Sequence, residues 1–554
     1  TDGSFLTDTA EITLNDAANY VVSNYVKGNK INYNLSDTKI YINSKNITTG
    51  TALNIGNAKA KLNNVVIKSG DISTSYTAIS VSDSTELEIN GNSVIDLSSI
   101  DGKKLYGIKA SGSNVIINNL LLKTNDYSSS RSTYSSTTTW VINDGEYYNK
   151  MVLGFSSIVG GKYKEAPGVQ YLIDGKALKY NEDIGFYEIT EGKYEARIGD
   201  VGYTKIEDAI ASSDKSTIYI MADIDEIVIP ANKNITLYNM SKKQVNKIIN
   251  NGTLTINLYD LEANIENKGV LVINKKVASV INDGEITVKS TGIISGDLTN
   301  NATISEINAG MYLGKIINNG TINKVIGGSF KYTDSIKDLI PTDYSLYKTK
   351  NSVYGDLKTV YADNMVEAIS DGYYYTSYKT AALNATKENP AKLLKNVVKD
   401  YDQLYDGNYY LDLNNYNMEF SGKSYNYGIS IAKGKLYIMG TGVINFNGAN
   451  AMFYVKGSSS SSTHDYTELV LGENVTVNAL NGMGAAMYTS GGKDKYGVNV
   501  TINGTINAAT ALYVNGQYEI SNENGPVFNV TKTAKLNGSI YAAGYATWNI
   551  EGNV

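Results

Sequence analysis

The chain has 554 residues, with 49 Lys and Arg against 55 Asp and Glu, no Cys, one His and 45 Tyr. The lack of cysteine excludes disulfides and zinc ribbons, and one histidine is too few for the multi-histidine sites of zinc and non-haem iron. Only Arg131 and Arg197 are arginines and the net charge is −6, so nucleic acid is not an expected partner. A hydrophobic share of 42% is typical of a folded protein.

No stretch of the chain approaches the roughly 18 apolar residues of a membrane span, and no span is expected in this segment. The chain begins with Thr-Asp-Gly, and we expect a mature or excised piece whose signal peptide and anchor lie outside it. The absence of cysteine is compatible with export without oxidative folding. We therefore expect an extracellular location, either secreted or at the cell surface.

Residues 1–125 are predicted to form a first β-helix stack with an N-terminal cap. Units open at Thr51, Thr77 and Tyr106, and each is followed by short strands with a local period of two. A linker and connector are predicted over 126–200. The run from Ser128 to Thr139 is polar and nearly uncharged, which predicts an exposed loop.

The connector occurs twice. The phrase that ends in Gly160-Gly161-Lys162-Tyr163 returns as Gly327-Gly328-Ser329-Phe330, and Phe186-Tyr187 returns as Val353-Tyr354, at the same distance along the chain. Short amphipathic helices are predicted after the two connectors, at Tyr203–Ile210 and Tyr375–Ala382. Such a helix can cover the open edge of a new stack of strands.

Residues 201–330 are predicted to form a second stack, because a short asparagine-containing phrase recurs there five times at nearly even intervals. Each interval fits one coil of a β-solenoid. Stacked coils lie about 4.8 Å apart, so the asparagines form a ladder of bonded amides, with a ligand site along them as the alternative. The ladder consists of Asn250, Asn267, Asn282, Asn300 and Asn318.

A second connector is predicted over 331–372, followed by a third stack with a cap over 373–554. Tyrosines recur in this last part and predict a ladder at the rim or in the interior of the stack, or an exposed platform for sugars. The candidate glycan contacts are Tyr373, Tyr374, Tyr375, Tyr454, Tyr488, Tyr513 and Tyr541.

Catalytic equipment is sparse in the sequence. Asp400, Asp402 and Asp406 could bind calcium, although they lack the ligand series of an EF-hand, and a solvated loop is the favoured interpretation. His464 is followed by an aspartate and lies near serines, but a surface histidine is favoured over half of a hydrolase triad. We expect no cofactor and no catalytic residue.

The phrases Gly252–Asn257, Asn232–Leu237, Gly327–Phe330 and Gly202–Ile210 resemble the pectate-lyase-like right-handed parallel β-helix repeats of surface proteins and adhesins from Firmicutes. The resemblance covers about residues 40–554. It implies a β-helix, display at the cell surface and an adhesive or structural role. It carries over no functional residue, and the paired aspartates of the enzymes that share this fold do not recur here.

The sequence thus predicts an all-β protein, a right-handed parallel β-helix (β-solenoid) in tandem stacks with short capping helices and small α+β connectors. The expected function is that of a non-enzymatic structural stalk, adhesin, self-assembling fibre or surface-layer subunit. Its expected partners are other copies of itself, end to end, or a glycan or protein of a host or bacterial surface. The alternatives are a polysaccharide lyase or hydrolase and a glycan-binding module.

Overall fold

The computed structural model describes most of the chain. The described residues are 11–14, 22–24, 31–42, 50–69, 75–100, 104–125, 130–135, 137–239, 243–259, 261–457, 467–488, 497–517, 526–544 and 546–554. They form two compact units, Thr1–Ala278 with Asp283–Ile286, and Ser279–Asn282 with Thr287–Val554. Both are built from short strands in parallel sheets, so the predicted all-β fold, a parallel β-helix, is confirmed.

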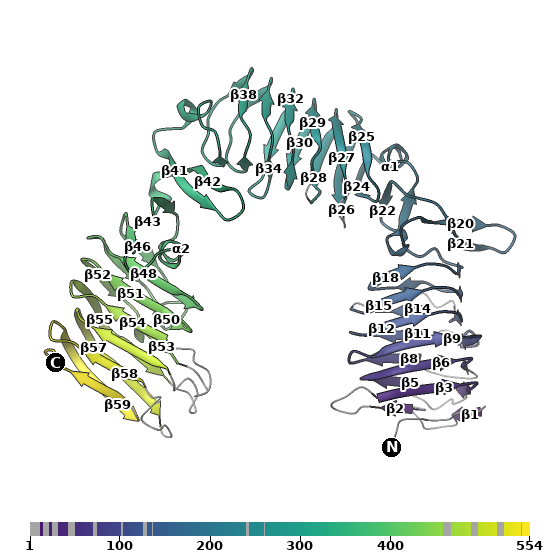
Figure 1. Ribbon diagram of the computed structural model, residues 1–554, viewed down its shortest axis with the longest axis horizontal. Helices are drawn as coiled ribbons and strands as arrows, with labels where there is room; N and C mark the ends of the chain where they lie inside the picture. Colours follow the sequence, from purple (N-terminus) through teal and green to yellow (C-terminus); the bar gives the residue numbers. More distant parts are fainter. Residues whose placement is uncertain are drawn as a thin grey trace. The chain divides into compact units, whose positions relative to one another are not determined.

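The first stack consists of three parallel sheets, and each coil contributes one strand to each (Figure 1). The first sheet contains β1 (Glu11–Leu14), β4 (Lys39–Ile42), β7 (Val66–Ser69), β10 (Ser93–Asp96), β13 (Leu120–Lys123), β16 (Glu146–Tyr147) and β19 (Lys162–Tyr163). The second contains β2 (Val22–Asn24), β5 (Gly50–Gly56), β8 (Tyr76–Ser82), β11 (Leu105–Ala110), β14 (Arg131–Tyr134) and β17 (Met151–Val152). The third contains β3 (Ile31–Ser36), β6 (Ala58–Asn63), β9 (Glu86–Asn90), β12 (Asn114–Ile117), β15 (Thr139–Ile142) and β18 (Phe155–Ile158).

The core of this stack consists of columns of aliphatic side chains. Strand residues alternate between the interior and the outer face, so like residues of successive coils lie on one another. In the third sheet Leu62 pairs with Ile89, Ile89 with Ile117, and Ile117 with Ile142. All four are at most 1% exposed. The strands continue past residue 125 to Tyr163.

The prediction of an exposed loop over Ser128–Thr139 is wrong for most of its described residues, although Tyr134, Thr137 and Thr139 are exposed. Ser132, Thr133 and Thr138 are fully buried inside the first stack. The hydroxyls of Ser132 and Thr133 fit the interior because neighbouring coils supply hydrogen-bond partners. The Ser132 hydroxyl, for example, accepts a bond of 3.3 Å from the backbone N–H of Asn149.

The first stack ends at an antiparallel hairpin, formed by β20 (Lys176–Asn181) and β21 (Phe186–Glu191), after the 3₁₀ turn η1 (Val169–Tyr171). Strand β21 pairs with β19, with Tyr163 opposite Tyr187. In the second unit β40 (Ser329–Phe330) pairs in the same way with a hairpin of β41 (Tyr344–Asn351) and β42 (Gly355–Ala362), with Phe330 opposite Lys358.

The predicted duplication therefore holds for Tyr163 and Phe330, but the equivalence of Phe186-Tyr187 with Val353-Tyr354 is wrong. Tyr187 corresponds to Lys358, four positions beyond Tyr354. The cause is the longer second hairpin, whose strands have eight residues each instead of six. Two 3₁₀ turns, η2 (Lys337–Leu339) and η3 (Asp363–Met365), flank this hairpin.

The next strands of the first unit begin a new stack with an antiparallel pair, followed by parallel strands. They are β22 (Ala196–Ile198), β23 (Val201–Tyr203), β24 (Lys215–Ile220), β25 (Ile224–Ile229), β26 (Asn234–Asn239), β27 (Val245–Asn250), β28 (Thr253–Asn257), β29 (Asn264–Asn267), β30 (Val270–Ile273) and β31 (Lys276–Val277). β33 (Glu285–Val288) has residues in both units. The second unit contains β32 (Val280–Asn282), β34 (Ile293–Ile294), β35 (Leu298–Asn300), β36 (Thr303–Ile304), β37 (Met311–Tyr312), β38 (Ile316–Asn318) and β39 (Thr321–Ile322), before β40.

The last stack lies wholly in the second unit and has its own core. One sheet contains β44 (Tyr373–Tyr375), β43 (Ala368–Ser370), β45 (Ala391–Leu393), β48 (Asn408–Asp412), β51 (Lys435–Met439), β54 (Thr467–Leu471), β56 (Val498–Ile502), β58 (Val527–Val530) and β60 (Thr547–Ile550). The other contains β46 (Val397–Lys399), β47 (Asp402–Tyr405), β49 (Met418–Phe420), β50 (Tyr427–Ala432), β52 (Gly442–Phe446), β53 (Ala451–Lys456), β55 (Val475–Tyr488), β57 (Thr505–Gln517) and β59 (Lys535–Gly544).

The two predicted capping helices are present, as α1 (Ile206–Ala211) and α2 (Tyr378–Leu383). Each begins three residues later than predicted, because Tyr203 and Tyr375 end the strands β23 and β44. Each helix buries one face, which includes Ile206, Ala209 and Ile210 in α1. The helices thus cover the first strands of a new stack, as the amphipathic pattern indicates.

Candidate functional site

The predicted asparagine ladder is hydrogen-bonded within each unit. In the first unit, the Asn250 amide donates to Asn267 Oδ1 at 2.7 Å. In the second unit, Asn282 donates to Asn300 at 3.0 Å and Asn300 donates to Asn318 at 2.9 Å. All except Asn318 are fully buried. Since these amides have partners inside the protein, the ladder contributes to the fold.

A column of glycines accompanies the buried asparagines for steric reasons. A Cβ atom on Gly252 would lie 2.3 Å from the carbonyl oxygen of Pro230. One on Gly269 would lie 2.0 Å from the carbonyl oxygen of Gly252. At these two coils the turn therefore brings the backbones too close for a side chain, whereas the equivalent residue after Asn300 is Ala302.

Further asparagine ladders, which were not predicted, run along the outer faces of the first and last stacks. Each amide donates to the carbonyl of the preceding coil, whereas the buried amides Asn250, Asn282 and Asn300 donate to the following one. The outer donor–acceptor pairs are Asn90–Asn63, Asn118–Asn90, Asn143–Asn118, Asn478–Asn445, Asn507–Asn478 and Asn537–Asn507, at 2.6–3.0 Å. Their signal in the sequence is an asparagine that recurs at the same place in successive coils: at or just after the end of β6, β9, β12 and β15 in the first stack, and within β52, β55, β57 and β59 in the last.

A carboxylate holds the start of each capping helix. Glu195 Oε2 accepts a bond of 3.0 Å from the N–H of Ile206, and its other oxygen is 3.0 Å from Lys205 Nζ. In the second unit, Glu367 Oε2 accepts a bond of 2.9 Å from the N–H of Tyr378. A helix start has unpaired N–H groups and a positive dipole end, so a carboxylate stabilises it. We call each assembly of glutamate, antiparallel strand pair and helix a capping unit.

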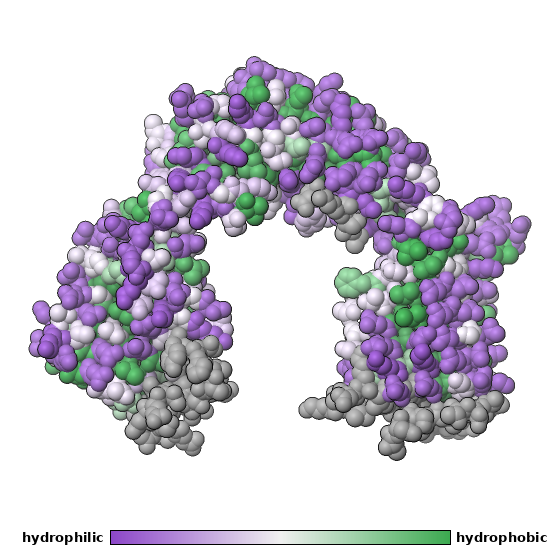
Figure 2. Space-filling model, in the orientation of Figure 1, coloured by the Kyte–Doolittle hydropathy of each residue, from purple (hydrophilic) through white to green (hydrophobic). Residues whose placement is uncertain are grey.

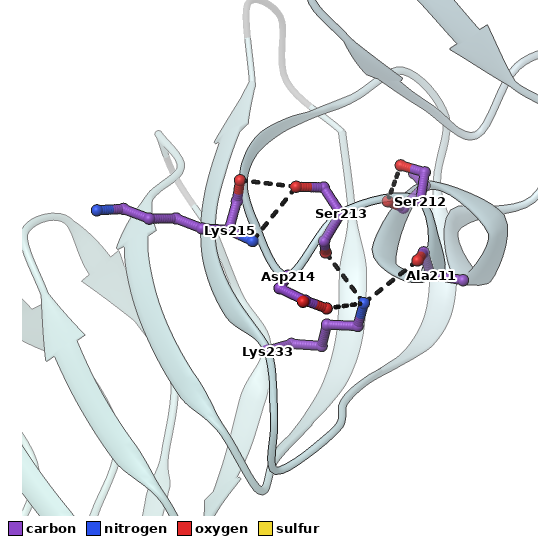
Figure 3. A network of polar contacts seen from close by, with 7 residues as sticks. Ala211, Ser212, Ser213, Asp214, Lys215 and Lys233 are labelled. Carbon is purple, nitrogen blue, oxygen red and sulfur yellow. Dashed lines mark hydrogen bonds and ion pairs between the residues drawn. The ribbon is translucent and has the colours of Figure 1, made fainter.

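The end of helix α1 is closed by a lysine from a later strand connection. Lys233 Nζ donates to the carbonyl oxygens of Ala211 and Ser213 at 3.2 and 3.1 Å, and lies 2.9 Å from Asp214 Oδ1 (Figure 3). Its side chain is only 10% exposed. An ammonium group is favourable there because the last carbonyls of a helix lack partners within the helix.

The predicted glycan contacts Tyr373, Tyr374 and Tyr375 are half-buried, and they contact other parts of the second unit. The Tyr373 hydroxyl donates to Asp356 at 2.7 Å, and this bond lowers the pKa of Asp356. The Tyr374 ring lies 5.0 Å from that of Tyr347 in β41. Tyr375 packs against the core. These rings join the hairpin to the capping unit.

The predicted tyrosine column is interrupted. Tyr454 pairs with Ala486, which pairs with Tyr513, and Tyr513 pairs with Tyr541. Only the last two rings stack, at 4.7 Å and 11°. Tyr488 pairs with Asn515, two positions further along β57. The alignment of Tyr488 in this column is wrong, and the chain between Tyr454 and Tyr488 contains the irregular register between Ala479 and Met483.

A different tyrosine cluster, which was not predicted from the sequence, forms in the last stack. The Tyr401 ring lies 4.2 Å from that of Tyr425, and Tyr427 lies 5.8 Å from Tyr454 in a stacked arrangement. Gln403 donates a bond of 2.8 Å to the Tyr427 hydroxyl. The cluster combines rings from three successive coils. The neighbour of Tyr454 in this cluster is Tyr427, whereas the predicted column had placed Tyr454 beside Tyr488.

The three candidate calcium ligands have separate roles. Asp400 accepts bonds from the Ser421 hydroxyl and from the N–H groups of Lys423 and Ser424, and these bonds keep the pKa of its carboxyl well below the usual range. Asp402 accepts from the Tyr378 hydroxyl, and burial raises its pKa. Asp406 occupies a turn with φ of 52°. In the part of the chain that the structure describes, no three His, Cys, Asp or Glu side chains are placed to hold a metal ion.

The contacts of the two arginines are structural and do not place either one in a groove with other charged side chains. Arg197 is 7% exposed, with its guanidinium 3.8 Å from the centre of the Tyr219 ring. Arg131 lies in β14 and donates to the carbonyl oxygen of Ser130 at 2.7 Å. His464 lies outside the described residues. Among the described residues, none of the helices is long and apolar enough to span a membrane.

The architecture and these contacts define a tandem parallel β-solenoid with capped stacks. No protein-family model, curated protein or solved structure matches the chain.

Proposed function

We propose that this chain is a non-enzymatic structural protein of a bacterial cell surface, in which tandem solenoid modules act as the stalk of an adhesin or as a fibre or surface-layer subunit. The observation that supports this proposal is the repetition of a whole module. Glu195, β22, β23 and α1 recur as Glu367, β43, β44 and α2, all at one common offset along the chain. A protein built from repeated modules sets its length by their number.

The ends of the modules support the same proposal. A stack of parallel strands has open edges, which pair with other chains unless they are covered. At the end of each of the first two stacks, an aromatic pair stacks face to face: Tyr147 with Tyr163 at 5.0 Å, and Tyr312 with Phe330 at 5.0 Å. A hairpin then pairs with the last strand. Such ends keep neighbouring modules separate in one long chain.

Excision of one module tests the stalk role. Deleting residues 195–366 joins Tyr194 to Glu367, which occupies the position equivalent to Glu195. We expect a soluble, β-rich protein that is shorter by one module, as measured by negative-stain electron microscopy and small-angle X-ray scattering. A deletion of residues 195–369 also removes Glu367, Ala368 and Ile369, so that α2 loses its carboxylate and part of β43, and it serves as the control for the junction. A particle of unchanged length would contradict the proposal.

The enzyme alternative is tested by incubating the full chain with acidic and neutral polysaccharides, with and without calcium. We expect no new reducing ends and no unsaturated products. Cleavage that is lost in Asp400→Asn or Asp402→Asn would overturn the non-enzymatic role. The fibre version has its own test: sedimentation velocity at rising concentration should show growing assemblies, and dispersed monomers throughout would leave the stalk version alone.

A further inference from the structure

A groove lies on the outer face of the third sheet of the first stack, with a volume of about 510 Å³. Residues two apart in a strand point to the same face, so each strand contributes two outward side chains. Across four coils these side chains form two rows with a floor at Ala60 and Leu87 between them. The rows are Asn32, Lys59, Glu86 and Asn114, and Asn34, Lys61, Glu88 and Ile116.

The charges of the groove are paired across coils. Lys59 Nζ is 3.7 Å from Glu86, and Lys61 Nζ is 3.1 Å from Glu88. Both lysine side chains are 60% exposed. Exposed ion pairs contribute little to stability, so these pairs are not explained by folding alone. They give the walls many donors and acceptors without a net charge.

The rows continue into the next two coils, where they become less polar. Asn114 pairs with Thr139, and Thr139 pairs with Phe155. The Phe155 side chain is 74% exposed. Figure 2 shows that hydrophilic residues cover much of the visible face of the first stack, with a narrow hydrophobic strip between them. A large exposed ring in line with a polar groove suits a ligand that has both hydroxyl groups and an apolar face.

We propose that this groove binds a neutral, linear glycan that lies along the stack, a ligand that the stalk role does not require. Hydroxyl groups can bond to the paired lysines, glutamates and asparagine amides, and a sugar ring can stack on Phe155. A polyanion would meet Glu86 and Glu88 beside each lysine. An extended peptide cannot add to the sheet here, because the backbone groups of β6 and β9 already pair with their neighbours.

The test is calorimetric titration of the full chain with four neutral hexasaccharides, cellohexaose, xylohexaose, maltohexaose and hexa-N-acetylchitohexaose, and with hexagalacturonate. We expect saturable binding of at least one neutral glycan, nearly unchanged between low and high salt, since no net charge is neutralised. Phe155→Ala and Lys61→Ala should each weaken binding about three- to tenfold.

Lys68→Ala is the matched control. Lys68 is an exposed lysine in the same coil as Lys61, but it lies in β7 of another sheet and pairs in register with Asp96. Its substitution should leave binding unchanged. The proposal is overturned if no neutral hexasaccharide binds, if hexagalacturonate binds more tightly in low salt, or if Lys68→Ala weakens binding as much as Lys61→Ala. Binding of an extended peptide in competition with the glycan would likewise reassign the groove.

Discussion

The two capping units share their layout but differ in how firmly each glutamate is held. In both units the glutamate accepts from the first N–H of the helix, and the strand after it is antiparallel to both neighbours. Glu195 pairs with Lys205, which is 67% exposed, while Glu367 pairs with Lys399, which is 31% exposed. The shared position of the carboxylate indicates that covering the stack requires it, whereas its cation comes from whichever segment lies nearby.

The helix ends differ more than the helix starts. Lys233 closes α1 from another strand connection, whereas the side chain of Asn384 closes α2 from its own C-cap by donating to Thr380 O at 2.8 Å. Tyr378 at the start of α2 also donates to Asp402, and Ile206 in the equivalent position cannot. The second capping unit thus contains more buried polar groups, and its stability should depend more on charge.

The largest difference between the capping units should follow removal of the glutamate. Glu367→Ala leaves Lys399 half-buried without its partner and exposes the helix start, and should cost about 3 kcal/mol. Glu195→Ala loses only a cap and should cost about 1 kcal/mol. Hydrogen exchange at the N–H of Tyr378 and of Ile206 measures each unit separately. Glutamine at either position keeps the acceptor and is the control, and equal losses in both alanine variants would refute the comparison.

The next largest effect should follow substitution by alanine of the glycine that lies two residues before Tyr163 or before Phe330. Gly161 and Gly328 have φ of 107° and 93°, and a Cβ atom would lie 3.0 Å from Tyr163 Oη or from Phe330 Cζ. We expect a loss of about 1–2 kcal/mol at both positions. Urea unfolding followed by exchange mass spectrometry of each stack measures the two losses. A neutral result at one position would show that the two stack ends are not equivalent.

Substitution of the groups that close the helix ends should have smaller effects. Lys233→Met removes three polar contacts of a nearly buried ammonium group, and should cost about 1 kcal/mol. Asn384→Ala removes one exposed bond and should cost about 0.5 kcal/mol. Exchange rates in α1 and α2 report the two effects, with Lys215→Met as an exposed control next to Asp214. A larger increase in exchange rate of α2 in Asn384→Ala than of α1 in Lys233→Met would reverse the expected order.

The smallest expected effect is the contribution of Asp402, which contacts the second capping unit through Tyr378, to the pH dependence of stability. Burial raises the pKa of Asp402 above its ordinary 3.8, although Tyr378, Lys379 and Lys399 oppose this and Glu367 adds to it. The folded protein then holds this proton more tightly than the unfolded chain, so the contribution of Asp402 to stability falls as pH rises from the ordinary pKa through the raised one. Asp402→Asn should remove this slope and gain stability relative to the wild type above that window. If the stability of the wild type and of Asp402→Asn changed with pH in the same way, the pH dependence would not come from Asp402.

Much of the fold could be predicted because a solenoid repeats its residues along the chain. The buried asparagines mark one residue of each coil, so their spacing predicted the stack. The helices followed from their apolar faces. The glutamates Glu195 and Glu367 were missed because they reach the helix across a strand pair that separates them from it in the sequence. Their signal was nevertheless present, since Glu-Ala precedes both strand pairs at the same offset as the helices.

Other features could not be predicted because they depend on register between coils. The buried serines and threonines around Ser132 have the composition of a loop, and their partners come from neighbouring coils. Tyr488 lies two positions beyond Ala486, the residue that pairs with both Tyr454 and Tyr513. The groove beside Lys61 exists only when four strands align. Local composition carries no record of which residue lies above which.

The antiparallel hairpins at the stack ends have a mechanical consequence. A coil at the end of a parallel stack can unfold by itself under a pulling force. Its loss leaves the next coil at the end of the stack, so that the coils unfold one after another. β21 and β42 interrupt this sequence, because their residues pair in the opposite direction and with a partner that is adjacent in the chain. Under tension, damage that begins in one stack would therefore stop at the hairpin, and the neighbouring stack would still bear load.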